Sequence, residues 1–181
     1  MRFSELGLPG AWRVELEPHE DERGFFARTF CEEEFAAHGL ATRYPQCNLS
    51  YSRHAGVLRG MHYQAAPHGE AKLVRCVRGA IHDVVVDIRG GSPSRGRWLG
   101  VVLDARSRGA LYVPEGFAHG FLTLQEDTEV FYQMGAAYAP EAQRGFRWDD
   151  PSFGIEWPFP PRTISERDRT WPDFGAGELD G

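Results

Sequence analysis

The feature that most constrains the fold is a long succession of short, strand-like apolar segments between residues 42 and 134. Gly, Pro, Ser and Asp separate them, and the pattern predicts strands at 42–51, 57–63, 72–77, 80–89, 97–103, 110–113, 117–124 and 128–134. Many short strands with turn signals favour an all-β sandwich or barrel. Helix-period segments between the strands are missing, and no dinucleotide-binding or P-loop glycine pattern occurs, which argues against a doubly wound sheet.

Outside this region the chain predicts strands at 8–17 and 25–30 and a short helix at 31–39. Acidic residues begin that helix and Gly39 ends it, as the helix dipole and C-cap preferences favour. The Pro- and Trp-rich tail from Tyr138 is expected to wrap the barrel as loops, with a short helix at 165–169 capped by Ser165. The length of 181 residues predicts a single domain over 1–181.

Composition excludes several classes of protein. A net charge of −6 disfavours binding to nucleic acid through general electrostatics. The three cysteines, Cys31, Cys47 and Cys76, form no CxxC pair and are expected to be free thiols in a reducing compartment. No apolar run is long enough for a signal peptide or a membrane span, so we expect a soluble cytoplasmic protein.

The stretch 56–79 concentrates polar chemistry on two short strands, and it contains Lys72, the chain's only lysine. Polar groups on rigid strands are typical of an enzyme pocket. Because alternate strand residues share a face, His62, His119 and Tyr132 are expected to meet in one cavity of the barrel. Taken singly, His119 and Tyr132 are equally compatible with hydrogen-bonded core residues. Strict alternation places Arg59 opposite His62, unless Gly60 marks a bulge.

Two segments resemble the two motifs of the cupins. Gly56 precedes His62, but Gln64 stands where a second histidine ligand is expected, and the second motif is present as PEGFAH at 114–119. Two imidazoles are a poor transition-metal site. The resemblance implies an all-β, cupin-like jelly-roll barrel with a few short helices and without a metal, while a metal-dependent cupin remains an alternative.

Longer motifs make the resemblance more specific. DERGFF at 21–26, RGMHYQ at 59–64, KLVRCVRGAIHDVVVDIR at 72–89, PEGFAHGF at 114–121 and WDDP at 148–151 are similar to the dTDP-4-dehydrorhamnose 3,5-epimerase family. The similarity extends from about Asp21 to Asp168. It implies an isomerase of the rhamnose pathway that epimerises C3 and/or C5 of a dTDP-4-keto-6-deoxyhexose through an enolate, without a cofactor.

The resemblance also implies four catalytic residues. His62 would be the base, Asp168 would hold its imidazole, Tyr132 would donate a proton from the other face of the sugar, and Lys72 would lie near the enolate oxygen. Epimerisation next to a carbonyl needs this combination of a base, an acid and a positive group. Asp168 enters only through the resemblance.

Further residues are implied in substrate binding. Arg23 and Arg59 would bind the diphosphate, Tyr138 would stack on thymine and His119 would contact the sugar. The implied set is completed by Phe25, Arg28, Gln46, Cys47, Asn48, Gln143 and Arg167. In the family the N-terminal segment that carries Arg23 often reaches the partner's site, which implies a homodimer with the N-terminal strands at its interface.

Three positions depart from the family pattern. Arg28 and Gln143 stand where glutamates are typical, and Arg167 replaces a lysine before Asp168. The sugar and the epimerised centre therefore stay open. The alternatives are a C3- or C5-only epimerase of an antibiotic deoxysugar and a cupin that only binds a sugar nucleotide.

Overall fold

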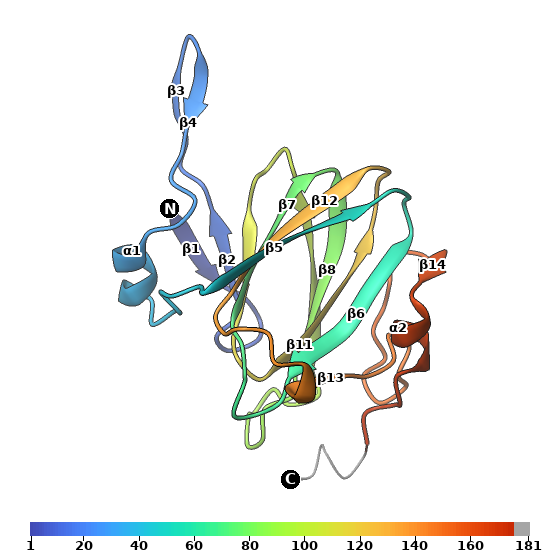
Figure 1. Ribbon diagram of the computed structural model, residues 1–181. Helices are drawn as coiled ribbons and strands as arrows, with labels where there is room; N and C mark the ends of the chain where they lie inside the picture. Colours follow the sequence, from blue (N-terminus) through green and yellow to red (C-terminus); the bar gives the residue numbers. More distant parts are fainter. Residues whose placement is uncertain (176–181) are drawn as a thin grey trace.

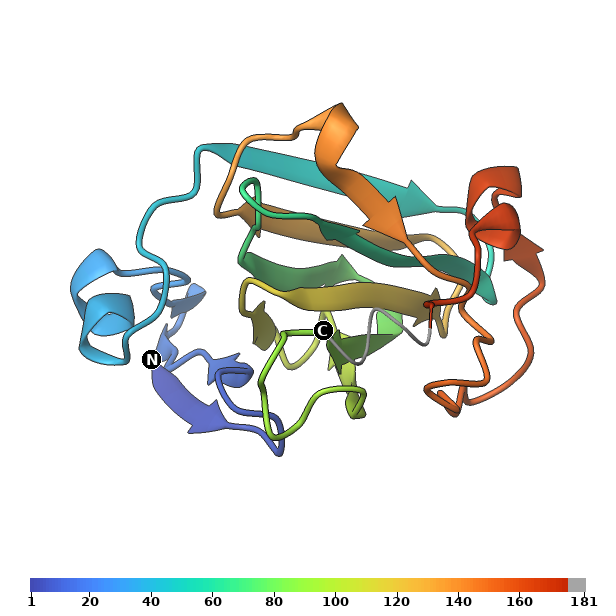
Figure 2. The same ribbon diagram turned by 90° about the horizontal axis from the view of Figure 1, so that it is seen from below.

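The computed structural model describes residues 1–175, and nearly all its regular structure is strand, arranged in two facing sheets (Figures 1 and 2). The first sheet has the order β1 (Arg2–Glu5), β2 (Trp12–Glu15), β10 (Ala110–Val113), β7 (Lys72–Arg78), β12 (Thr128–Met134) and β5 (Gln46–Ser52). The second has the order β13 (Gln143–Gly145), β6 (Val57–Gln64), β11 (Phe117–Thr123), β8 (Ala80–Asp87) and β9 (Trp98–Asp104). The predicted all-β jelly-roll architecture is confirmed.

The core lies between the sheets and follows from strand alternation. Val74 and Val130 of the first sheet pack with Ile81, Val85 and Phe121 of the second, and all five are at most 2% exposed. Burying an aliphatic or aromatic side chain of this size stabilises a fold by about 1.5–3 kcal/mol. This apolar layer sets the distance between the two sheets. It therefore also sets the distance between the polar side chains that face each other from the same strands.

The N-terminal region differs in part from the expectation. The predicted strand at 8–17 begins only at Trp12, because Gly10 adopts a φ of 89° in a turn that pairs β2 with β1. The predicted strand at 25–30 ends at Phe26, as part of a hairpin of β3 (His19–Asp21) and β4 (Gly24–Phe26). This hairpin projects beyond the two sheets (Figure 1). The predicted helix is confirmed as α1 (Glu32–Ala37).

The C-terminal region covers the outer face of the second sheet. Phe146, Phe153 and Phe174 pack against Met61 and Val84 there. The short strand β14 (Thr163–Ile164) pairs in parallel with β6, and α2 (Glu166–Thr170) follows it beside the same strand (Figure 2). The predicted cap is confirmed, since Ser165 Oγ accepts a hydrogen bond from the backbone N–H of Asp168 at 3.0 Å.

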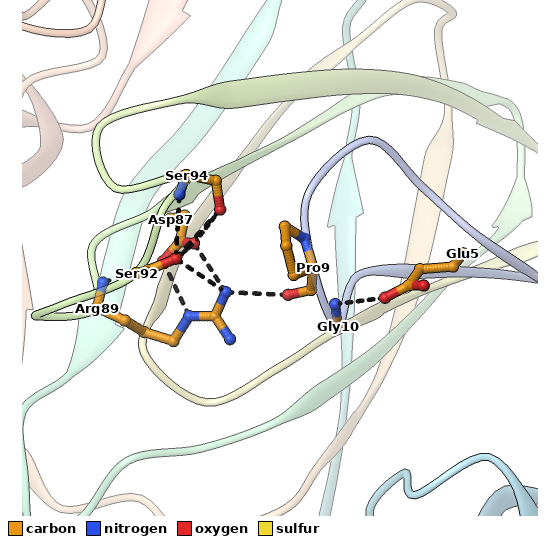
Figure 3. A network of polar contacts seen from close by, with 7 residues as sticks. All are labelled: Glu5, Pro9, Gly10, Asp87, Arg89, Ser92 and Ser94. Carbon is orange, nitrogen blue, oxygen red and sulfur yellow. Dashed lines mark hydrogen bonds and ion pairs between the residues drawn. The ribbon is translucent and has the colours of Figure 1, made fainter.

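A polar network fixes the loop between β8 and β9 (Figure 3). The Asp87 carboxylate is fully buried and accepts hydrogen bonds from Arg89, Ser92 and Ser94, while Arg89 also donates to the carbonyl of Pro9 at 2.9 Å.

Among residues 1–175, no helix is long and apolar enough to cross a membrane.

Candidate active site

A cavity of about 460 Å³ lies between the two sheets. The first sheet contributes Asn48, Ser50, Lys72, Tyr132 and Met134 to its walls. The second contributes Val57, Leu58, Arg59, His62, His119 and Phe121, and the β14–α2 segment adds Thr163, Ile164, Ser165 and Asp168. The predicted convergence of His62, His119 and Tyr132 in one cavity is confirmed.

A bulge in β6 brings Arg59 to the same cavity as His62. His62 pairs with His119, whereas Arg59 pairs with Phe121, so three steps along β6 are matched by two along β11. Gly60 lies at this irregularity with a φ of 130°, and a Cβ atom there would be 2.5 Å from the Cα of Gly120. Only glycine fits such a position. The bulge therefore places Arg59 at the same cavity as His62, whereas strict alternation would have placed the two side chains on opposite faces.

His62 and Asp168 form the shortest polar contact in the cavity wall. The Nε2–H of His62 donates to Oδ1 of Asp168 at 2.6 Å, which leaves Nδ1 as the nitrogen that can accept a proton. Burial opposes ionisation of Asp168, but the hydrogen bonds from His62 and from the N–H of Gly60 outweigh it and hold the pKa of this carboxyl below its ordinary value. A charged carboxylate fixes the tautomer of the imidazole and stabilises its protonated form.

Tyr132 approaches from the opposite sheet. Its hydroxyl is hydrogen-bonded to Ser50 Oγ at 3.0 Å, across the pairing of β12 with β5. Burial raises the pKa of this phenol, although the hydrogen bond to Ser50 acts in the other direction. Tyr132 is therefore held in its protonated form, as a proton donor requires.

A second histidine–carboxylate pair lies beside Tyr132. The Nε2–H of His119 donates to Oδ1 of Asp83 at 2.7 Å, and the His119 ring packs edge-on against Tyr132 with centroids 6.3 Å apart. Both members of the pair are buried. Each cavity histidine thus has its own carboxylate, and no group of three or more His, Cys, Asp or Glu side chains suited to a metal gathers within residues 1–175.

Lys72 supplies a buried positive charge at the cavity wall. Its Nζ lies 3.2 Å from Oε1 of Glu70 and donates to the carbonyl of His62 at 3.4 Å. A smaller cavity of about 160 Å³ adjoins the first and shares Asn48, His62, Lys72 and Met134 with it. Gln46, Tyr138 and Gln143 line this smaller cavity, so three more of the expected substrate-binding residues lie at the site.

Five of the expected residues do not line either cavity. Arg23, Phe25 and Arg28 belong to the projecting hairpin or the segment after it, where Arg23 pairs with Asp21 and Arg28 with Glu34. The other two are Cys47, an exposed residue of β5, and Arg167, whose guanidinium lies 5.1 Å from the ring of Trp171. Cys47 alternates with Gln46 and Asn48, which explains why its side chain faces away.

Sequence reasoning assigned no role to Ser50, Glu70 or Asp83. Asp83 is a carboxylate within a largely buried strand rich in Ile and Val, and that is a signal which could have identified it. Ser50 shares a strand face with Asn48, so alternation could have placed it beside the cavity. Glu70 lies outside any strand, and no local pattern indicates its contacts.

The arrangement can perform acid–base chemistry on a carbon acid. An imidazole from the second sheet and a carboxylate from α2 lie on one side of the cavity, and a protonated phenol and an ammonium project from the first sheet. A base, an acid and a positive charge around one substrate are the requirements for moving a proton next to a carbonyl.

Comparisons with known proteins agree with this chemistry. The family model described as dTDP-4-dehydrorhamnose 3,5-epimerase matches residues 5–176. The enzyme of that name from Methanothermobacter thermautotrophicus is 47% identical over 174 residues, covering 94% of this chain and 92% of the relative.

Solved structures of similar proteins match the fold of this chain over most of its length. The dTDP-4-dehydrorhamnose 3,5-epimerase of Elizabethkingia anophelis has a TM-score of 0.93 and 36% identity, with 96% of each chain covered. ChmJ of Streptomyces bikiniensis, a 3'-monoepimerase solved with dTDP-quinovose, has a TM-score of 0.85 and 41% identity, covering 92% of this chain and 85% of its own. The expected resemblance is confirmed, and the chain belongs to the dTDP-4-dehydrorhamnose 3,5-epimerase family.

Proposed function

We propose that this sugar-nucleotide epimerase inverts C3 and C5 of a dTDP-4-keto-6-deoxyhexose by proton transfer through an enolate. One observation carries the proposal: His62 of the second sheet, with Asp168 of α2, faces Tyr132, Ser50 and Lys72 of the first sheet across one cavity. A binding protein has no need of a base and an acid on two sides of its ligand.

The first step is removal of a proton from C3 or C5. Nδ1 of His62 takes the proton, and the electron pair of the C–H bond passes into the C4 carbonyl to form an enolate. Asp168 stabilises the imidazolium that results, since its carboxylate already accepts the Nε2–H at 2.6 Å. The ionised state of Asp168 is favoured before the substrate binds, because its pKa lies below the ordinary value.

Lys72 lies where it can stabilise the enolate. Its ammonium donates to the carbonyl of the base residue itself, so the cation and His62 hold a fixed relation. A fixed positive charge in a low-dielectric cavity stabilises developing negative charge more than water does.

Tyr132 completes the inversion. Its phenolic proton goes to the carbon from the face opposite His62, and the electrons of the enolate form the new C–H bond while the C4 carbonyl is restored. The phenolate then regains a proton through Ser50, which is hydrogen-bonded to it, and the imidazolium of His62 releases to solvent the proton that it took.

The nucleotide half of the substrate requires cationic and aromatic contacts. Arg59 lines the larger cavity, where bonds to Tyr51 O at 3.0 Å and Ser52 Oγ at 3.4 Å hold its guanidinium, and we assign it to the diphosphate. Tyr138, at the smaller cavity and 49% exposed, is free to stack on thymine.

We also propose a homodimer in which the projecting hairpin reaches the partner's cavity. Phe26 is 75% exposed and Arg23 is 84% exposed, and neither contacts the cavity of its own chain. Exposed aromatics on a projecting element are typical of a protein interface. Mixing Arg23→Ala with His62→Asn tests this, because one site of the heterodimer would then be intact. Recovery of about a quarter of wild-type activity is expected for statistical mixing in a C2 dimer, and no recovery would show that the hairpin serves its own site.

The decisive experiment is incubation with dTDP-4-keto-6-deoxyglucose in heavy water, followed by NMR location of the deuterium. Label at C3 and C5 is expected. Label at one carbon would make this chain a monoepimerase, as ChmJ is named. No incorporation at either carbon would overturn the proposed function.

A further inference from the structure

We propose that Glu70 and Gln64 are positioning residues that hold the Lys72 ammonium in place and aimed at the substrate carbonyl. The inference rests on the proposed function, because it concerns the cation assigned to the enolate. Both residues line the smaller cavity beside Lys72, and both act through Lys72.

The ion pair of Glu70 with Lys72 is almost entirely removed from solvent. Their side chains are 8% and 7% exposed, and Oε1 lies 3.2 Å from Nζ. An ammonium buried without a counter-ion is strongly disfavoured and tends to lose its proton. Within residues 1–175, no other carboxylate is within ion-pair distance of Lys72. The Glu70 carboxylate is thus the counter-ion of this buried ammonium in the cavity wall.

Gln64 fixes the orientation of that carboxylate. Its Nε2 donates to Oε2 of Glu70 at 3.1 Å and to the carbonyl of His68 at 3.0 Å, and its Oε1 accepts from the N–H of Ala139 at 2.7 Å. The two oxygens of Glu70 therefore have separate partners, one an amide and the other the ammonium. A glutamine side chain stays neutral and offers two N–H donors beside its acceptor oxygen, as these contacts use, whereas a neutral imidazole offers only one N–H donor. Gln64, which stands where the cupin motif has a second histidine, therefore has a role of its own: it orients the Glu70 carboxylate.

The consequence is a defined direction for Lys72. Of its three N–H groups, one is directed to Glu70 and one to the carbonyl of His62, and the third is left for the cavity. Lys72 lies in the wall shared by the larger and smaller cavities, so a substrate spanning both would pass its ammonium.

A double-mutant cycle separates this role from a purely structural ion pair. The variants are Glu70→Gln, Lys72→Met and the combination of both, with Glu141→Gln as the matched control. Glu141 is 71% exposed and contacts His68 rather than Lys72, so it removes the same charge from the same region. The readouts are kcat for deuterium exchange, KM, and the affinity for dTDP.

Glu70→Gln is expected to lower kcat by about 10- to 100-fold, as loss of an orienting partner does elsewhere. KM and dTDP affinity should change little, and the control should retain kcat within about twofold. In the Lys72→Met background the additional effect of Glu70→Gln should vanish, because the group through which it acts is gone. An undiminished effect in that background, or a normal kcat in Glu70→Gln, would overturn the proposal.

A second variant keeps the test decisive if Glu70→Gln does not fold. Glu70→Asp retains the negative charge but moves the carboxylate one methylene away from Lys72 and Gln64. This variant should fold, and its kcat should be lower than that of the wild type. A normal kcat in Glu70→Asp would then overturn the inference. Failure of the proposed function would be visible separately, as a wild-type enzyme without any deuterium exchange.

Discussion

His62 and Asp168 lie 106 positions apart in the chain, yet Nε2 of the first and Oδ1 of the second are 2.6 Å apart. Pairing of β14 with β6 and the cap of α2 by Ser165 bring them together. The contact is charge-assisted, since the carboxyl has a pKa below its ordinary value.

Asp168→Asn is expected to lower kcat by about 10²- to 10⁴-fold, with a smaller change in KM. The amide cannot stabilise an imidazolium, and it permits the wrong tautomer of His62. Steady-state kinetics and the rate of solvent deuterium exchange measure the loss. The control is Glu166→Gln, an exposed acid of the same helix, which should behave like wild type. An Asp168→Asn enzyme with wild-type kcat would contradict the assigned role.

Tyr132→Phe is expected to separate proton removal from inversion. His62 can still form the enolate, so deuterium should enter recovered substrate, while epimerised product falls by about 10²-fold or more. NMR of substrate and product measures both in one sample. Equal loss of exchange and inversion would argue against Tyr132 as the acid. Ser50→Ala retains the phenol and should give an intermediate kcat.

Ionisation of Tyr132 should not lower the rate of inversion at about pH 10, where an ordinary tyrosine loses its proton. Burial is the main effect that raises the pKa of this acid. A raised pKa means that the neutral donor persists to higher pH. Up to about pH 10, the ordinary pKa of a tyrosine, any decline in kcat is thus expected to be the same in wild type and Ser50→Ala. A Ser50→Ala enzyme whose alkaline decline moves to lower pH would contradict this.

Arg59→Ala is expected to weaken dTDP binding by about 10- to 100-fold and to leave the thermal midpoint nearly unchanged. A bidentate guanidinium–phosphate contact is charge-assisted and is lost entirely on truncation. Isothermal titration with dTDP measures the effect. Arg53→Ala, at an exposed arginine in the loop between β5 and β6, is the control and should bind dTDP normally. Normal binding by Arg59→Ala would remove this residue from the diphosphate site.

Asp87 provides a stability prediction (Figure 3). Burial opposes its ionisation, but Arg89, Ser92 and Ser94 together lower the pKa to about 2 from 3.8. A lowered carboxyl pKa contributes stability that is present above about pH 4 and is lost as the pH falls toward 2. The shift corresponds to about 2 kcal/mol in the free energy of unfolding.

Asp87→Asn should therefore lose about that much stability at pH 7 and show a flatter decline between pH 4 and 2. Urea unfolding across this range measures it. Asp149→Asn breaks a similar but largely exposed pair with Arg147 and should cost at most about 1 kcal/mol. An equal loss in both variants would show that burial of Asp87 is not what matters.

Much of the site was predictable because strand alternation is a local property. It placed His62, His119 and Tyr132 in one cavity, and local capping preference placed the N-terminus of α2 at Ser165. The same rule explains why Cys47 faces away while Gln46 and Asn48 line the site.

The sequence by itself determined the all-β architecture, the faces of its strands and the types of groups in its cavity. The tertiary structure alone decided which groups touch. It decided the side of Arg59 through a bulge at Gly60, the carboxylate of His119 and the partners of Glu70, whereas Asp168 was expected beside His62 through the family resemblance alone. Alternation says only which face a side chain occupies, whereas a hydrogen bond between distant segments depends on how strands and loops pack in three dimensions.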